Sequence, residues 1–184
     1  MKILALLILM LPGNAFVVDA GTSTTYTLDI PREALRGYVD DIGLFVRNMP
    51  GVVEARPLGD GSFLYRTEKE LPLAGTMQTD FLIGRRVEGD SVTVYESVNR
   101  ADPNYMYCRV LILPAGEGVT SIRIDLALRL TRESGSDVHW LAPILGASFI
   151  SDQMTKDLEA MLSEFVVRST EELYERLRPD HAGR

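Results

Sequence analysis

The 184-residue sequence has little of what disulfide frameworks, metal centres and nucleic-acid interfaces require. Its single cysteine, Cys108, excludes an intrachain disulfide, and its two histidines, His139 and His181, are far apart in the sequence, which argues against a zinc site. The formal net charge is −7 and Lys and Arg are not clustered, which argues against binding to nucleic acid or to anionic lipid headgroups. No apolar run approaches the roughly 20 residues of a membrane span. We therefore predict no metal, no cofactor, no nucleic-acid partner and no transmembrane span.

The first twenty residues, MKILALLILMLPGNAFVVDA, have the three-part pattern of a secretory signal peptide. Lys2 precedes an apolar run, and small residues follow at which cleavage is expected, after Ala15 or after Ala20. The alternative is an uncleaved N-terminal strand or an interfacial anchor. We expect a leader over residues 1–20, one domain over residues 21–178 and a frayed tail over residues 179–184. The predicted location is periplasmic or secreted, or cytoplasmic if the segment is not a leader.

Apolar periodicity then predicts a strand, a short helical region and a series of strands. STTYTLDI alternates like a half-buried strand, and PREALRGYVDDIGLFVRNM has one apolar face at helical spacing. Gly37 and Gly43 weaken that helix, which predicts two short helices or one kinked helix. Turn residues separate the following segments, so we predict an antiparallel meander. Its strands are VVEARPL, SFLYRTEKELPL, TMQTDFLIGRRVE, SVTVYESV, YMYCRVLIL and TSIRIDLALRL.

The last strand and the C-terminal region predict how the sheet is covered. TSIRIDLALRL alternates strictly between apolar and mostly polar residues, so one face of the sheet should be buried and the other solvated. From residue 143 to residue 177 the apolar spacing becomes helical. The stripe predicted to cover the sheet consists of Leu145, Phe149, Ile150, Met154, Leu158, Met161, Leu162, Phe165 and Val166.

This order of elements resembles the START/polyketide-cyclase-like (SRPBCC) superfamily, whose members include one of the subunits of carbon monoxide dehydrogenase. The local matches are YTLDIPREALRGYVDD, MPGVVEA and LGASFISDQMTKDLEAMLSEF, and the resemblance covers roughly residues 23–177. It implies an α+β helix-grip fold, in which a curved antiparallel sheet wraps around a long C-terminal helix and two short helices follow the first strand. It also implies a cavity between sheet and helix that commonly holds an apolar or amphipathic small molecule.

Methionine and aromatic side chains are spread over the predicted sheet and helix. Flexible thioethers and rings with polar tips suit a cavity that adapts to an apolar ligand, and they also suit an ordinary core. The residues predicted to contact a ligand are Phe63, Tyr65, Met77, Phe81, Tyr95, Tyr107, Trp140, Phe149, Met154 and Leu158.

The other reactive side chains are predicted to be structural. Cys108 lies in a strand with no histidine near it in sequence, which is typical of a small buried hydrophobe. The carboxylate pairs Asp40/Asp41 and Glu68/Glu70 are predicted to face water.

Two further features leave alternatives open. Arg66 and Arg109 are predicted at the surface, although an inward-pointing arginine could pair with a ligand carboxylate. Trp140, beside His139, is predicted to close one end of the cavity as a hydrophobic contact, or to contact a ligand at the mouth of the cavity.

Three functions fit these observations. The first is noncatalytic binding or transport of a hydrophobic or amphipathic, lipid-like small molecule, and the absence of a catalytic cluster together with the leader favours it. The second is an interaction module that docks a protein partner or a membrane, as implied by the resemblance to the carbon monoxide dehydrogenase protein; a contiguous exposed apolar patch would favour it. The third is a cyclase or dehydratase-type enzyme, which needs a proton-transferring group within the cavity.

Overall fold

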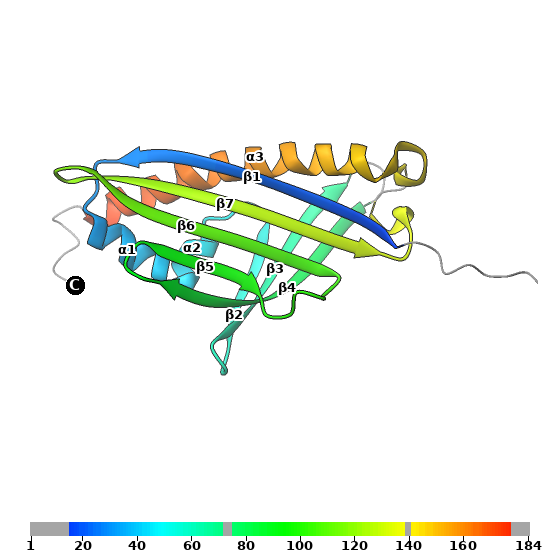
Figure 1. The fold of residues 1–184 in the computed structure, drawn as a ribbon, viewed down its shortest axis with the longest axis horizontal. Coiled ribbons are helices and arrows are strands. Elements are labelled where there is room, and N and C mark those ends of the chain that lie inside the picture. The colour runs from blue at the N-terminus through cyan, green and yellow to red at the C-terminus, as the bar shows by residue number, and fades with distance from the viewer. Residues whose placement is uncertain (1–14, 72–74, 139–140, 178–184) are drawn as a thin grey trace, which may run out of the picture.

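One curved sheet and one long helix make up most of the fold. The computed structural model describes residues 15–71, 75–138 and 141–177, in the arrangement shown in Figure 1. The elements in chain order are β1 (Phe16–Leu28), α1 (Arg32–Asp40), α2 (Ile42–Arg47), β2 (Val52–Leu58), β3 (Ser62–Leu71), β4 (Gly75–Glu88), β5 (Val92–Ser97), β6 (Asn104–Gly116), β7 (Val119–Arg132), the 3₁₀ turn η1 (Gly135–Asp137) and α3 (Ala142–Leu177). This order confirms the predicted α+β helix-grip architecture.

The sheet is the predicted antiparallel meander, with the first strand added at its end. The strand order is β1-β7-β6-β5-β4-β3-β2, so each strand from β2 to β7 pairs with its neighbour in sequence. β1 begins at Phe16, seven residues before the predicted STTYTLDI segment, because pairing with β7 continues from Leu28↔Thr120 to Phe16↔Arg132. Alternate residues of β7, such as Ile122 and Ile124, are buried, so one face of this strand forms core as predicted.

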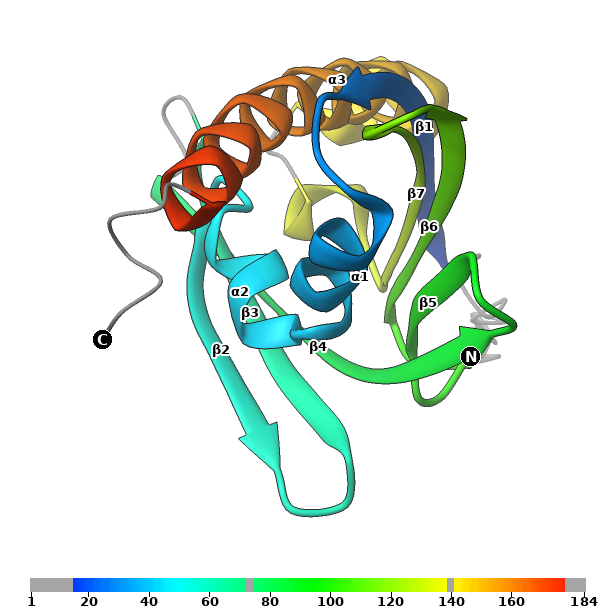
Figure 2. The ribbon, with the colours of Figure 1, turned by 90° about the vertical axis from the view of Figure 1, so that its left-hand side faces the viewer.

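Two short helices lie on the concave side of the sheet (Figure 2). They are separated at Asp41, rather than at the helix-weakening Gly37 or Gly43. The backbone of Asp41 is extended and its side chain accepts a hydrogen bond from the Leu44 amide at 3.1 Å, so Asp41 caps the second helix. The chain then reverses at Gly51, whose φ of +78° favours glycine, and enters β2.

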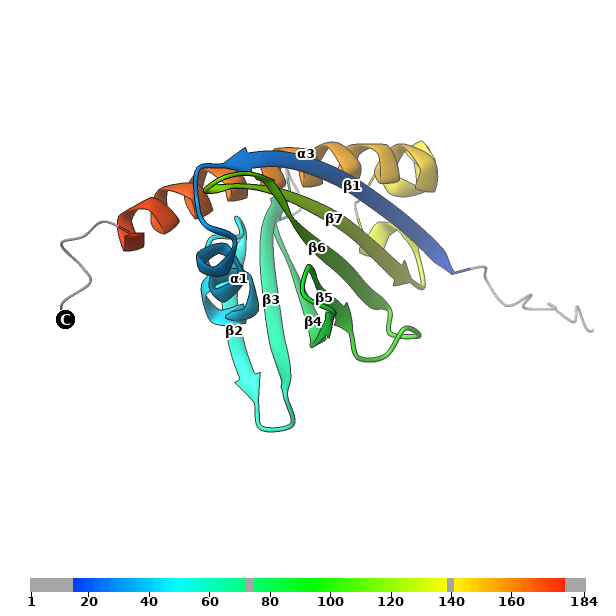
Figure 3. The same cartoon turned by 60° about the vertical axis from the view of Figure 1, so that its left-hand side comes forward.

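The long helix α3 crosses the open side of the curled sheet, so that sheet and helix enclose the core (Figures 2 and 3). Its path breaks at Gly146, which has φ of +82° and ψ of 164°. Leu158 and Leu162 are buried as predicted, but Leu145 and Phe149 are 40% and 51% exposed. These two predictions were wrong because neither of these side chains, which lie on either side of the Gly146 break, packs into the core, although Ala142 at the start of α3 is fully buried. Within the described ranges, no helix is long and apolar enough to cross a bilayer.

Asp40 is a tertiary anchor rather than a fully solvated carboxylate. Its carboxylate accepts hydrogen bonds from Arg36 Nε at 2.8 Å and from Thr93 Oγ1 at 2.9 Å, and Arg85 Nη1 lies 3.5 Å away. Asp40 therefore ties the end of α1 to β4 and β5. The prediction of a water-facing pair was wrong for Asp40, because these three partners come from elsewhere on α1 and from strands distant in sequence, while the exposed Asp41 caps α2.

This anchor predicts acid-sensitive stability. Partial burial would raise the pKa of Asp40, but the hydrogen bonds from Arg36 and Thr93 and the charges of Arg36 and Arg85 outweigh it and hold the pKa below 3.8. A lowered pKa in the folded state stabilises the protein above the unfolded-state pKa, and this contribution is lost as the pH falls through the folded-state pKa. We expect Asp40→Asn to lower the free energy of unfolding at pH 7 by roughly 1 kcal/mol and to flatten its decrease below about pH 4.

Urea unfolding between pH 7 and pH 2.5 measures both effects. Glu171→Gln, at an exposed position of α3, is the control and should give a curve parallel to that of the unsubstituted chain. Equal acid sensitivity of the Asp40→Asn variant and the unsubstituted chain would contradict the anchoring role.

Candidate ligand-binding cavity

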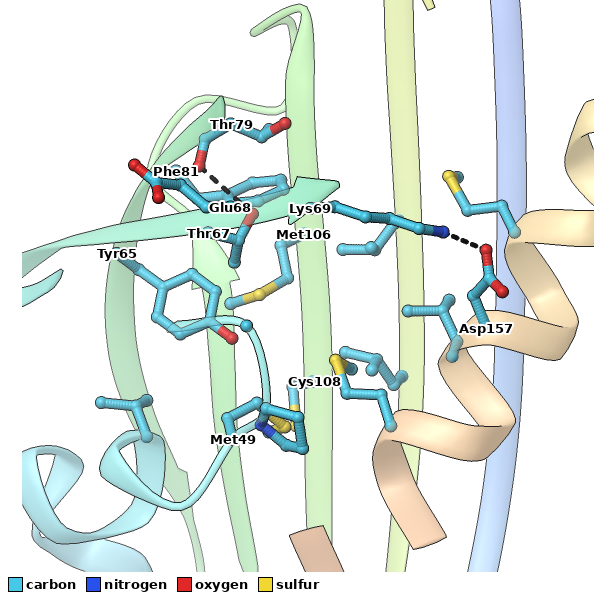
Figure 4. Close-up of a pocket in the computed structure, with 18 of the residues that line it drawn as sticks. Met49, Tyr65, Thr67, Glu68, Lys69, Thr79, Phe81, Met106, Cys108 and Asp157 are labelled. Atoms are coloured by element: carbon cyan, nitrogen blue, oxygen red, sulfur yellow. Dashed lines mark hydrogen bonds and ion pairs between the residues drawn. The ribbon is translucent and has the colours of Figure 1, made fainter. Parts of the chain in front are cut away.

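A cavity of about 400 Å³ lies between the concave face of the sheet and α3 (Figure 4). This volume is within the range of sites that enclose small organic ligands. Its walls come from α2, the turn before β2, strands β3 to β7 and the middle of α3. The residues that line it are Phe45, Val46, Met49, Pro50, Gly51, Tyr65, Thr67, Glu68, Lys69, Met77, Thr79, Phe81, Ile83, Tyr95, Met106, Cys108, Leu126, Leu128, Leu130, Met154, Asp157, Leu158, Ala160, Met161 and Glu164.

Sulfur is concentrated on this lining. The chain has seven methionines; Met1 and Met10 precede the described residues, and the other five all line the cavity. Cys108 adds a sixth sulfur atom. Unbranched thioethers are flexible and polarizable, and they make favourable contacts with aromatic rings. The walls can therefore adapt to ligands of different shape.

Paired residues of β3 and β4 set a gradient of polarity from the interior to the mouth. Three cross-strand pairs follow one another on the concave face: Tyr65↔Phe81, Thr67↔Thr79 and Lys69↔Met77. Tyr65, Phe81 and Thr79 are buried, whereas Lys69 is exposed. The period of two along each strand explains this order, since every second side chain points to the same face.

The charged lining residues lie at the mouth. Lys69 on β3 makes an ion pair with Asp157 on α3, as Figure 4 shows. Glu164 is also exposed there and is paired with Arg168 on the same helix. Glu68 alternates with Thr67 and Lys69, so its carboxylate lies on the opposite face of β3, where it accepts a hydrogen bond from Gln78 Nε2 at 3.2 Å. Both carboxylates at the mouth are therefore paired with cations, and the Lys69–Asp157 pair bridges the mouth from sheet to helix.

The ionisable groups deeper in the cavity are neutral at physiological pH. Burial raises the pKa of the Cys108 thiol to about 12, with a smaller contribution from the charge of Asp125. Burial likewise raises the pKa of Tyr65 and of Tyr95 above the ordinary value of 10.0. No thiolate or phenolate is thus available as a nucleophile or base, and these groups act as neutral donors or apolar surface.

Six of the ten predicted ligand contacts lie on this lining. Phe63 shares the concave face with Tyr65, but it lines a separate hollow beside α2 together with Ile42 and Pro57. Tyr107 is outside the cavity because it alternates with Met106 and Cys108, both of which line it. Phe149 is outside because its side chain is 51% exposed, and Trp140 lies outside the described residues. The six that the structure brings together are Tyr65, Met77, Phe81, Tyr95, Met154 and Leu158.

The sequence contains signals for several lining residues that were not predicted. Thr67 and Lys69 follow Tyr65 at the strand period of two, and Asp157 follows Met154 at helical spacing. Met49 has no such signal, because the turn before β2 brings it to the cavity. Once one residue of a strand or helix is known to face the cavity, the period of that strand or helix predicts which of its other residues face the cavity as well.

The remaining predictions concern residues outside the cavity. Arg66 forms ion pairs with Asp80 and Glu54 at 2.6 and 3.0 Å, and Arg109 lies 3.5 Å from Asp125. Neither arginine lines the cavity, so their predicted surface placement is confirmed.

In the part of the chain that is described, no three His, Cys, Asp or Glu side chains form a group that could hold a metal ion.

Comparisons with known proteins reveal similarity of fold. No family model matches the sequence, and no curated protein matches it. A START superfamily protein from Mycobacterium smegmatis is 13% identical with a TM-score of 0.58, over 84% of this chain and 97% of that one. The Zhui aromatase/cyclase from Streptomyces sp. R1128 is 18% identical with a TM-score of 0.56, over 88% and 98% of the two chains. A conserved protein from Geobacillus kaustophilus is 11% identical with a TM-score of 0.57, over 86% and 97%.

These similarities and the strand order define the class of fold. The chain has the START/polyketide-cyclase-like, or SRPBCC, helix-grip fold. At such low sequence identity the similarity carries no information about a particular ligand or reaction, and function must be argued from the cavity itself.

Proposed function

We propose that this chain binds or carries a hydrophobic or amphipathic small molecule in the cavity between the sheet and α3, without transforming it. The observation that carries this proposal is the apolar cavity of about 400 Å³ on which all five methionines of the described chain converge. Burial of apolar ligand surface contributes about 25 cal/mol per Å², so a ligand enclosed here would gain useful affinity without a charged contact.

The chemistry of the lining favours binding over catalysis. A cyclase or dehydratase needs a group that transfers protons within the cavity. Among the described lining residues, the charged side chains lie at the mouth, and the deeper phenols and thiol have raised pKa values. The similarity to an aromatase/cyclase therefore supports the shape of the cavity more than the reaction.

We also propose that binding takes place outside the cytoplasm, in the periplasm or after secretion. The leader-like segment MKILALLILMLPGNA supports this location, since it has the charge and apolar pattern of a signal peptide. A carrier in an extracytoplasmic space would bind apolar molecules that are poorly soluble in water.

Titration with the neutral fluorescent dye Nile red tests the proposed function. We expect saturable binding, and we expect Met154→Trp to weaken it at least tenfold because the larger side chain fills cavity space. Val167→Trp is the matched control, since Val167 is 55% exposed on the same helix and does not line the cavity. Its affinity should remain within twofold of the unsubstituted chain.

Native and denatured mass spectrometry of the purified protein adds an independent measurement. A discrete excess of the native mass over the denatured mass would identify a co-purified small molecule.

In the dye titration, saturable binding of Nile red that is equally strong in the Met154→Trp variant would place the dye elsewhere and contradict the proposal.

A further inference from the structure

Tyr65 presents a hydroxyl group to the interior of the cavity. The side chain is 4% exposed, and its ring lies 6.0 Å from that of Phe81 on the neighbouring strand. Figure 4 shows the hydroxyl pointing away from β3 into the space between sheet and helix. The ring is therefore fixed by packing, while its polar end faces the volume that a ligand would occupy.

This hydroxyl has no hydrogen-bond partner among the described residues, whereas the neighbouring Tyr95 hydroxyl donates to the Val39 carbonyl oxygen. Among described side chains, the only fully enclosed polar atom that lacks a partner is Asn104 Oδ1. The Tyr65 oxygen is thus not sealed in protein, and it borders the open cavity. A wholly apolar ligand in the cavity would leave this hydroxyl without a partner, which is costly, so a ligand oxygen that accepts its hydrogen bond gains affinity.

The described cavity lining has no unpaired cation that could receive an anion. The described lining contains one cationic side chain, Lys69, and its ammonium group is already paired with Asp157 at the mouth. Glu164 is likewise paired with Arg168, and the Glu68 carboxylate lies on the opposite face of β3. A carboxylate or phosphate would leave water and find no free cation within the described cavity lining. Such transfer of an unpaired charge into an apolar site is strongly unfavourable.

We infer that the preferred ligand is an uncharged, compact apolar molecule with an oxygen that accepts a hydrogen bond from the Tyr65 hydroxyl. The inference rests on the proposed function and specifies its ligand class: a ketone, ester or similar neutral oxygen compound rather than an ionised fatty acid or phospholipid. Thr79, whose hydroxyl also lacks a partner among the described residues, lies one cross-strand pair nearer the mouth.

Three probes of nearly equal shape test this specificity. They are 2-acetylnaphthalene, which has a carbonyl oxygen, 2-isopropenylnaphthalene, in which CH₂ replaces that oxygen, and 2-naphthoate, which is ionised at pH 7. Their dissociation constants are measured by fluorescence titration with the unsubstituted chain, with Tyr65→Phe and with Tyr107→Phe. Tyr107 carries the same hydroxyl on the opposite face of the sheet and is the matched control.

We expect Tyr65→Phe to weaken binding of the ketone about fivefold to tenfold, and to change binding of the alkene less than twofold. Tyr107→Phe should change neither. The naphthoate should bind the unsubstituted chain at least tenfold more weakly than the ketone. Infrared spectroscopy adds a measurement that needs no variant. When the ketone carries ¹³C at its carbonyl group, the carbonyl stretching frequency of the bound ketone should be lower than that of the same ketone in a hydrocarbon solvent.

The outcomes separate this inference from the proposed function. Equal weakening of ketone and alkene in the Tyr65→Phe variant, an unshifted carbonyl stretch, or tight binding of naphthoate would overturn the inference while leaving the cavity as a binding site. Failure of the unsubstituted chain to bind any of the three probes or Nile red would overturn both.

Discussion

A chain that begins at Gly21 is expected to unfold at a much lower urea concentration than a chain that begins at Phe16. The two differ by the first five residues of β1, which pair with the end of β7 from Phe16↔Arg132 to Ala20↔Leu128. Val18 is fully buried within this segment and Ala20 is 7% exposed. Deleting them removes both core contacts and strand pairing.

The packing of Phe16 adds to the expected loss. Its ring contacts the η1 turn so closely that a Cβ on Gly135 would lie 2.9 Å from Phe16 Cε2. Full burial of an apolar side chain such as Val18 contributes about 1.5–3 kcal/mol, and Phe16 and Ala20 contribute further. We therefore expect the shorter chain to lose about 4 kcal/mol, a large part of the ~5–15 kcal/mol typical of a folded domain.

Urea unfolding of the two purified chains, monitored by circular dichroism, measures this difference. A chain that begins at Phe16 and carries Val17→Thr is the control, since Val17 is 38% exposed on the same strand and its substitution should cost less than about 1 kcal/mol. Equal urea midpoints for the chains that begin at Phe16 and Gly21 would contradict the role of the segment.

This expectation bears on where the predicted leader would be cleaved. We propose that cleavage occurs after Ala15 rather than after Ala20, because cleavage after Ala20 would remove a strand segment that packs into the core. The domain would then begin at residue 16 instead of residue 21. N-terminal sequencing of the exported protein would distinguish the two sites, and a start at Gly21 would contradict the proposal.

The fold could be predicted because most of its strands and helices can be recognised from residues that are close together in the sequence. Strict alternation in TSIRIDLALRL and helical spacing after residue 143 each follow from the period of one element, and turn residues separate the strands. Their order was then enough to indicate a helix-grip fold. The start of β1 was missed because residues 16–20 were assigned to the leader, and because Gly21 and Thr22 weaken the strand pattern between them and Ser23; pairing with β7 compensates for it.

The site could be predicted only in part. It depends on which alternate residues of each strand face the cavity and on contacts between residues that are far apart in the sequence. Tyr107 shares its phase with Arg109, and this charged neighbour signals an outward face. Lys69 and Asp157 are 88 positions apart, so no local pattern indicates that they meet. The separation of Phe63 from the cavity likewise depends on how α2 lies against the sheet.

The largest single-residue effect on stability is expected at Phe165. Its ring lies 5.0 Å from that of Phe45 on α2, in an edge-to-face arrangement, and Phe45 stacks on Tyr95 of β5 at 5.2 Å. Phe165 is 1% exposed and Phe45 is 2% exposed. This cluster of three rings joins α3, α2 and the sheet at one place, so replacing Phe165 by alanine would leave a void among all three elements.

We expect Phe165→Ala to lower the free energy of unfolding by about 3–5 kcal/mol, measured by urea unfolding. Val167→Ala, at an exposed position of the same helix, should change it by less than about 0.5 kcal/mol. The double variant Phe45→Ala/Phe165→Ala should lose less than the sum of the single losses, by roughly 0.5–1.5 kcal/mol, because the ring contact is removed only once. A loss below about 1.5 kcal/mol for Phe165→Ala would show that these rings do not hold α3.

The aromatic cluster also predicts where the proposed ligand would enter while the fold stays intact. Phe165 and Leu173 fix the C-terminal half of α3 in the core, and the buried Leu158 and Leu162 fix its middle. Met154 and Met161 beside the cavity are only partly buried, and the Lys69–Asp157 pair bridges the mouth at an exposed position. An exposed ion pair contributes little stability, so separating it costs much less than disrupting the ring cluster. For the proposed ligand we therefore expect exchange through the mouth, by separation of Lys69 from Asp157 and local movement of α3 around Met154. In hydrogen exchange, the amides around residue 154 should lose protection before those around residue 165, and the Phe165→Ala variant should reduce this difference.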